Sequence, residues 1–493
     1  MQIRGAYEGR PVEKAVHGCD SESQDMLRKL ENSSIFGVQK ALRDRSPALP
    51  RSIRRDETAP GSTSMKRLRG RLNVFQAAML GWRDLHPYNA VHAVRIEGAL
   101  AQAAMTGAID DTLTHAGLTG LVLDRAHARY AWRGGTAHTA LEVIRATGDA
   151  SHIVAQVFER HLNVRFPTDG PMDPFRFFAI DLENAFFLGL AYDHFIAGGD
   201  SIVVLLKAIA DRYHGKSVAS ALELYPPTHA RLFVRHPLDS LRAIARFPGM
   251  AASCRRTIRP RYRSIEDGYN AFTLFSLEAR DFTVLRNAAK RLGVTLNDAL
   301  IALLLLAQDA QAPERDRTKR RHELAVASIM NLRDAHGEDV ERTFGQFLSS
   351  FRVSHAVPAG ITLPELARDV HRTTERIKRE RLYLTTLSAM AVDGVIGRFQ
   401  DPSQRMQVYA KSYPVGAGVS TLNVNALWKS QDAASVPLYI RGVPTGPAAP
   451  LVVAVTTAGD TLCAGVSYRT AAFGPDVIDR IRDHMIERIK ALT

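Results

Sequence analysis

The stretch Tyr192-Asp193-His194-Phe195-Ile196-Ala197-Gly198-Gly199-Asp200-Ser201 decides the fold, because it places one histidine between an apolar strand and a helix. Upstream, residues 185–191 are apolar and rich in aromatic side chains over the length of a strand. Downstream, apolar side chains recur at helical spacing, at Ile202, Leu205, Leu206, Ile209 and Tyr213. We therefore expect His194 at the end of a strand, where it can act as a base.

The four residues before the helical pattern have the composition of a turn and a helix start. Asp200 or Ser201 is placed to cap the helix. Gly198 and Gly199 allow a sharp turn or a close approach to a ligand. For these four residues a structural role is favoured over direct chemistry.

This segment resembles the His-His-x-x-x-Asp-Gly signature of the chloramphenicol-acetyltransferase-like superfamily, which includes condensation domains, wax-ester synthases and BAHD acyltransferases. His194 takes the place of the second histidine, and Gly199 and Ser201 match the glycine and the following serine. The first histidine is replaced by Asp193 and the aspartate by Gly198.

The missing aspartate has a candidate substitute two residues later. In the family this aspartate orients the loop through an arginine. The resemblance therefore implies that Asp200 replaces it and pairs with Arg333, although an arginine on the surface is an equal alternative. Asp193 is expected to be exposed or held by structural hydrogen bonds.

Further segments resemble the superfamily in the expected order along the chain. They are residues 74–76 and 86–89, then 295–300, 331–333 and 344–348, then 418–423 and 465–469. The resemblance covers residues 72–493 and implies an α/β fold, an α+β sandwich of two chloramphenicol-acetyltransferase-like lobes with an active-site tunnel between them. We expect the lobes at 72–250 and 265–493.

Local patterns agree with mixed α/β structure. Residues 174–180 and 185–191 are expected to form a hairpin, as are 451–456 and 462–468. One helix is expected to end at Gly293 and the next to open at Asn297. A closing amphipathic helix is predicted by Ile478, Ile481, Met485, Ile489 and Leu492.

Composition limits the class of protein. A chain of 493 residues with 45% hydrophobic content is long enough for two cores. No run of about 18 apolar residues predicts a membrane span, and no signal peptide is recognised, so a cytoplasmic protein is expected. The widely spaced Cys19, Cys254 and Cys463 suggest neither a disulfide framework nor a metal site. Residues 1–70 read as a disordered basic extension, and whether 1–64 belong to the native protein is open.

The net charge of +13 suits an acidic partner, such as a carrier protein or the phosphates of coenzyme A. Five arginines crowd the expected linker between the lobes, where a solvated linker is favoured over a docking strip. They are Arg255, Arg256, Arg259, Arg261 and Arg263. No nucleic-acid motif accompanies the charge, so we expect no nucleic-acid partner.

The chemistry implied by the resemblance is acyl transfer from a coenzyme A or phosphopantetheine-carrier thioester to a hydroxyl or amine, with ester or amide formation. His194 would be the general base. The family mechanism needs no nucleophilic Ser or Cys, and no Gly-x-Ser-x-Gly segment is present. Oxyanion donors or tunnel residues could come from Ser420, Thr421 and Asn423, although ordinary strand polarity is slightly favoured for them.

No bound cofactor is expected, because no dinucleotide or phosphate-loop motif is complete. The alternative function, from a different class, is a degenerate noncatalytic module that binds a carrier or partner protein. It is motivated by Asp193 and Gly198 at the two altered signature positions.

Overall fold

The computed structural model describes residues 68–218, 223–224, 229–311, 320–337, 339, 343–428 and 436–492. Residues Met65–Thr493 form one compact unit. Most of the expected N-terminal extension lies outside the described residues. Its last residues belong to the fold, because β1 (Leu68–Arg71) pairs with β4 (Arg129–Trp132) in a small sheet with β3 (Leu121–Asp124) and β6 (Gly170–Met172).

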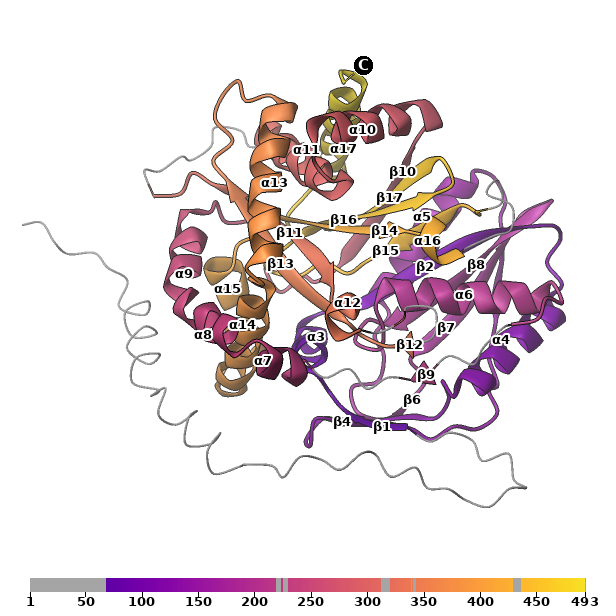
Figure 1. Ribbon diagram of the computed structural model, residues 1–493. Helices are drawn as coiled ribbons and strands as arrows, with labels where there is room; N and C mark the ends of the chain where they lie inside the picture. The colour runs from indigo at the N-terminus through magenta and orange to yellow at the C-terminus, as the bar shows by residue number, and fades with distance from the viewer. Residues whose placement is uncertain are drawn as a thin grey trace, which may run out of the picture. The chain divides into compact units, whose positions relative to one another are not determined.

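The N-terminal half is built on a five-stranded sheet (Figure 1). Its order is β15 (Tyr439–Gly442), β2 (Asn89–Glu97), β8 (Ala185–Asp193), β7 (Phe175–Asp181) and β5 (Glu142–Arg145). The β7–β8 hairpin is antiparallel, as predicted. All nine residues of β8 are buried, because helices cover both faces of the sheet.

The two faces of this sheet have separate cores. On one face pack α3 (Val74–Leu85), α4 (Gln102–Ala116) and α6 (Gly199–Tyr213). The other face carries α5 (Ala150–Asn163), which also packs on β10 (Asn270–Leu277), a strand of the C-terminal half. Gly189 in β8 is required by close packing, since a Cβ there would lie 2.1 Å from the ring of Phe178.

The C-terminal half is built on a six-stranded mixed sheet. Its order is β10 (Asn270–Leu277), β17 (Thr461–Arg469), β16 (Leu451–Ala458), β14 (Ala417–Asn423), β11 (Leu324–Asn331) and β13 (Leu348–His355). The helices on it are α10 (Ala279–Leu292), α11 (Leu296–Ala310), α13 (Leu363–Arg379) and α17 (Pro475–Lys490). The β16–β17 hairpin, the end of α10 at left-handed Gly293 and the closing helix α17 are as predicted.

One strand joins the two halves. β15 follows β14 in the chain but pairs antiparallel with β2, so that Arg441 lies opposite His92. The remaining elements are β9 (Glu223–Leu224), α7 (Ala230–Arg235), α8 (Pro237–Ala245), α9 (Phe247–Arg256), α12 (Arg333–His336), β12 (Thr343–Phe344), α14 (Tyr383–Ile396), η1 (Gly397–Phe399), α15 (Pro402–Ser412) and α16 (Asn425–Trp428).

Part of the expected linker is helical. Pro248 and Gly249 lie in the first turn of α9, where a proline is well tolerated. Among the described residues, no single helix is long and apolar enough to cross a membrane. Only α10 and α11 taken together reach that length and composition, and they are bent by 106°.

Candidate active site

His194 directly follows the last residue of β8, and two tyrosines fix its place. The ring of Tyr88 stacks on the imidazole with centroids 5.9 Å apart, and the Tyr192 ring meets it edge-on at 5.8 Å. The backbone N–H of His194 donates to the carbonyl of Tyr88, at 3.4 Å. The prediction that this histidine stands at a strand end is confirmed.

The electrostatic environment keeps His194 neutral. Burial lowers its pKa to about 4, and the positive charge of Arg441 acts in the same direction, whereas the Ala197 backbone opposes them. The residue is nevertheless only half-buried. Nδ1 of the ring is enclosed, next to the Ala197 backbone.

The helix after the histidine begins earlier than predicted. Gly198 is the N-cap and carries no capping side chain, so the prediction of Asp200 or Ser201 as the cap is wrong. Both side chains are buried in the first turn, where the guanidinium of Arg333 binds them. Oδ2 of Asp200 pairs with Arg333, and Oδ1 accepts the backbone N–H of Ser201 at 2.8 Å.

The expected pair between Asp200 and Arg333 is present. Nε of Arg333 lies 2.5 Å from a carboxylate oxygen of Asp200, and both side chains are buried. Asn331 donates to the same oxygen at 2.8 Å. Arg333 also donates to the Ser201 hydroxyl at 2.5 Å and to the Thr343 carbonyl at 3.0 Å. Segments from both halves therefore meet at this carboxylate.

The carboxylate of Asp200 fills the space beside Gly198. A Cβ built on Gly198 would lie 2.8 Å from Oδ1 of Asp200, closer than real Cβ atoms come. An aspartate at position 198 and the native aspartate at 200 would therefore compete for one place. This geometry supports the substitution that the sequence suggested.

Asp193 directly precedes His194 in the chain and is fully buried, not exposed. Its carboxylate forms an ion pair with Arg83 of α3, whose Nη2 also donates to the carbonyl of Thr168 at 2.7 Å. Burial raises the pKa of Asp193 to about 6, against the attraction of Arg83. The pair connects the end of β8 to α3.

The three candidate residues on β14 do not act together. Ser420 lies beside Arg441, which donates to its carbonyl at 2.7 Å. Thr421 and Asn423 alternate onto the other face of the strand, and the Thr421 hydroxyl contacts Asn297 at 3.3 Å. Only Ser420 is linked to the histidine region, through Arg441.

Sequence reasoning missed a buried polar layer next to the loop. His92 bonds the Tyr439 hydroxyl at 2.8 Å, and Arg441 donates to Val455 and Thr456 as well as to Ser420. A Cβ on Gly199 would lie 3.3 Å from the His92 ring and 3.4 Å from Arg441. The sequence signal for this layer was His92 and Arg441, each a polar residue within an otherwise largely apolar strand.

The five linker arginines are exposed, and bonds to the C-terminal half hold this segment in place. Arg256 pairs with Glu323 at 2.5 Å, Arg259 donates to the Lys411 carbonyl at 3.0 Å, and Arg263 donates to the Thr470 carbonyl. Cys254 and Cys463 are both buried. No group of three potential metal-ligating side chains occurs among the described residues.

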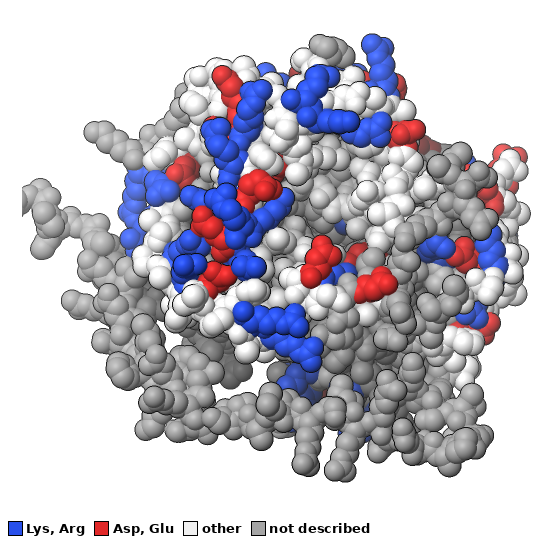
Figure 2. Space-filling view, viewed as in Figure 1, with Lys and Arg blue, Asp and Glu red and all other residues white. Residues whose placement is uncertain are grey.

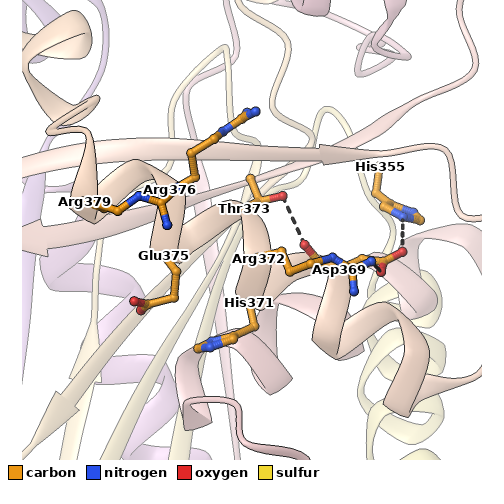
Figure 3. A pocket seen from close by; sticks show the side chains of 8 residues that line it. All are labelled: His355, Asp369, His371, Arg372, Thr373, Glu375, Arg376 and Arg379. Carbon is orange, nitrogen blue, oxygen red and sulfur yellow. Dashed lines mark hydrogen bonds and ion pairs between the residues drawn. The ribbon is translucent and has the colours of Figure 1, made fainter.

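A hollow of about 650 Å³ lies along α13, and none of the residues around His194 lines it. Basic side chains gather over α13 in Figure 2, with carboxylates between them. Figure 3 shows that the imidazole of His355 contacts the carboxylate of Asp369. It also shows Asp369 and Glu375 between the basic side chains that line the hollow. Arg372 and Lys378 also have carboxylate partners on the same helix. The hollow is a surface feature lined by largely compensated charges.

Solved structures share this architecture. No protein-family model matches the sequence, and no curated protein matches it. The cyclization-docking bidomain EpoB from Sorangium cellulosum is 13% identical with a TM-score of 0.63, over 99% of this chain and 95% of that one.

Two further structures agree. The first condensation domain of the calcium-dependent antibiotic synthetase, in complex with a substrate analogue, is 15% identical with a TM-score of 0.62, over 86% and 96%. The X-domain from teicoplanin biosynthesis is 17% identical with a TM-score of 0.56, over 88% and 96%. The chain therefore has the mixed α/β fold of the condensation domains, as its sequence resemblance implied.

Proposed function

We propose that this protein is an acyltransferase of the condensation type, which joins an acyl thioester to an amine or hydroxyl in natural-product or lipid biosynthesis. The observation that carries the proposal is the placement of a neutral, half-buried His194 at the end of β8, between two tyrosines. A neutral imidazole is the form that accepts a proton. The likeness to synthetase domains supports a donor held on a carrier protein, with coenzyme A as the alternative.

In the proposed reaction the acceptor attacks the thioester carbonyl directly. Nε2 of His194 takes the proton from the attacking hydroxyl or amine as the new bond forms. The tetrahedral intermediate then collapses and the acyl–sulfur bond breaks. The thiolate leaves and takes up the proton that His194 holds, which returns the imidazole to its neutral form. Bound substrate would displace water from the imidazole, and the fixed loop would hold the nitrogen in line with the acceptor.

Thiol release from a panel of acyl-CoA and acyl-pantetheine thioesters, with primary amines and alcohols as acceptors, tests this role. His194→Gln should lower the rate of the chemical step by about 10²- to 10⁴-fold, the usual contribution of a positioned base. His355→Gln is the matched control, because His355 is also half-buried but bonds Asp369 on α13. Thermal unfolding should be nearly the same for all three proteins.

The pH profile gives an independent check. Because burial lowers the pKa of His194 to about 4, kcat/KM should stay level from pH 7 to pH 5 and fall only near pH 4. An acid limb centred near 6.5 would contradict a buried base. Equal rates for the wild type and His194→Gln would instead favour the noncatalytic module that binds a carrier or partner protein.

A further inference from the structure

The loop that carries His194 is held through its backbone carbonyls by two buried glutamines. Nε2 of Gln346 donates to the carbonyl of His194 at 2.9 Å and to that of Ala197 at 3.3 Å. Nε2 of Gln76, at the start of α3, donates to the carbonyl of Phe195 at 3.1 Å. Three of the four carbonyls from His194 to Ala197 thus accept bonds from side chains.

Gln346 belongs to the C-terminal half and is itself firmly placed. It is 0% exposed, and its carbonyl accepts a bond from Nδ2 of Asn73 at 3.2 Å. On one side Gly345 accepts the N–H of Gly198 at 3.1 Å, and on the other the ring of Phe347 lies 4.1 Å from the Arg333 guanidinium. The amide is therefore a fixed donor that reaches the loop from the opposite half.

The two carbonyls that Gln346 binds stand at the two ends of the loop. A single NH2 group that contacts both fixes the distance between them, and with it the direction in which the imidazole leaves the backbone. The other amide atom, Oε1, is buried without a hydrogen-bond partner. An unpaired buried acceptor is costly, so the bonds that Nε2 donates to the two carbonyls have to offset that cost.

We propose that Gln346 is a positioning residue through which the C-terminal half sets the orientation of His194. The inference rests on the proposed role of His194 as the base. Loss of the two donated bonds frees the carbonyls, the loop relaxes and Nε2 shifts relative to the acceptor. A displacement of about 1 Å at a reacting group lowers a rate by about 10²-fold.

Three variants separate positioning from general stability. Gln346→Met keeps the length of the side chain and removes both donated bonds. Gln346→Glu donates one bond when its carboxyl is protonated and repels both carbonyls when it is ionised. Ser349→Ala is the control, because Ser349 is equally buried in the neighbouring strand and donates one bond to the Tyr383 carbonyl, away from the loop.

In kinetic assays with the thioester panel, Gln346→Met should lower kcat by about 10²-fold with little change in KM. Gln346→Glu should retain more activity at acidic pH and lose it as its carboxyl ionises, a limb that the wild type and Gln346→Met lack. Ser349→Ala should match the wild type in kcat. Equal kcat values for Gln346→Met and Ser349→Ala would overturn the inference.

A spectroscopic readout keeps the test independent of catalysis. In protein labelled with ¹⁵N-histidine, the His194 resonances can be assigned by their loss in His194→Gln. Gln346→Met should change the His194 ring shifts and titration midpoint, whereas Ser349→Ala should leave both unchanged. Unchanged His194 resonances in Gln346→Met would refute positioning. Changed resonances in a protein that turns over no thioester would refute only the proposed function.

Discussion

Two buried aspartate–arginine pairs flank His194, and they differ in what they connect. Asp193 and Arg83 join the end of β8 to α3 within the N-terminal half. Asp200 and Arg333 join α6 to α12, which follows a strand of the C-terminal sheet. The carboxylate of Asp200 also accepts a hydrogen bond from Asn331. Arg333 also donates to the hydroxyls of Ser201 and Thr343. The first pair is therefore local, whereas the second belongs to a network between the halves.

The largest expected effect follows from breaking the pair between the halves. Asp200→Asn and Arg333→Met should each lower the free energy of unfolding by about 3–5 kcal/mol, since each leaves the other group buried without its counter-charge. Urea unfolding monitored by tryptophan fluorescence measures this. The double variant should lose less than the sum of the single losses, with a coupling of about 0.5–3 kcal/mol. Strict additivity would show that the two groups do not stabilise each other.

A carboxylate exchange makes the comparison sharper. Gly198 has φ −74° and ψ 160°, a conformation that aspartate adopts readily as an N-cap. Gly198→Asp alone should destabilise the protein, because the new side chain collides with the Asp200 carboxylate. In the Asp200→Ala background the same change should restore about 1–3 kcal/mol of stability, together with activity. If Gly198→Asp changed the free energy of unfolding in the same direction in both backgrounds, the two carboxylates would not compete for one place.

Much of the fold could be predicted from local sequence patterns. Apolar runs of strand length predict the β7–β8 and β16–β17 hairpins. Helical spacing of apolar residues predicts α10 and α17, and Gly293 marks the end of α10. The pairing of β15 with β2 could not be predicted in this way. Period-2 alternation marks a strand but does not name a partner several hundred residues away.

The candidate site likewise has features that local sequence predicts and features that depend on distant contacts. The place of His194 followed from local signals, and the pair of Asp200 with Arg333 was suggested by resemblance and then found in the structure. The cap at Gly198 was missed because Arg333, distant in sequence, engages both candidate capping side chains. Gln346, Arg441 and the burial of Asp193 depend on tertiary contacts that no short window of sequence contains.

The smallest expected effect is at the local pair, where Asp193→Asn should lower the free energy of unfolding by only about 1–2 kcal/mol at pH 7. Burial raises the pKa of Asp193 to about 6, so the ionised carboxylate is disfavoured at this site and its loss costs less, and Arg83 also keeps its bond to Thr168.

The pH dependence of this loss has a definite sign. Burial raises the pKa of Asp193 to about 6, above its value in the unfolded chain. Between about pH 4 and pH 6 the folded wild type therefore binds more protons than the unfolded chain, and this group makes stability fall as the pH rises. Asp193→Asn lacks that contribution, so its deficit relative to the wild type should be larger at pH 4.5 than at pH 7. A deficit that grows with pH would mean that the attraction of Arg83 outweighs burial at Asp193.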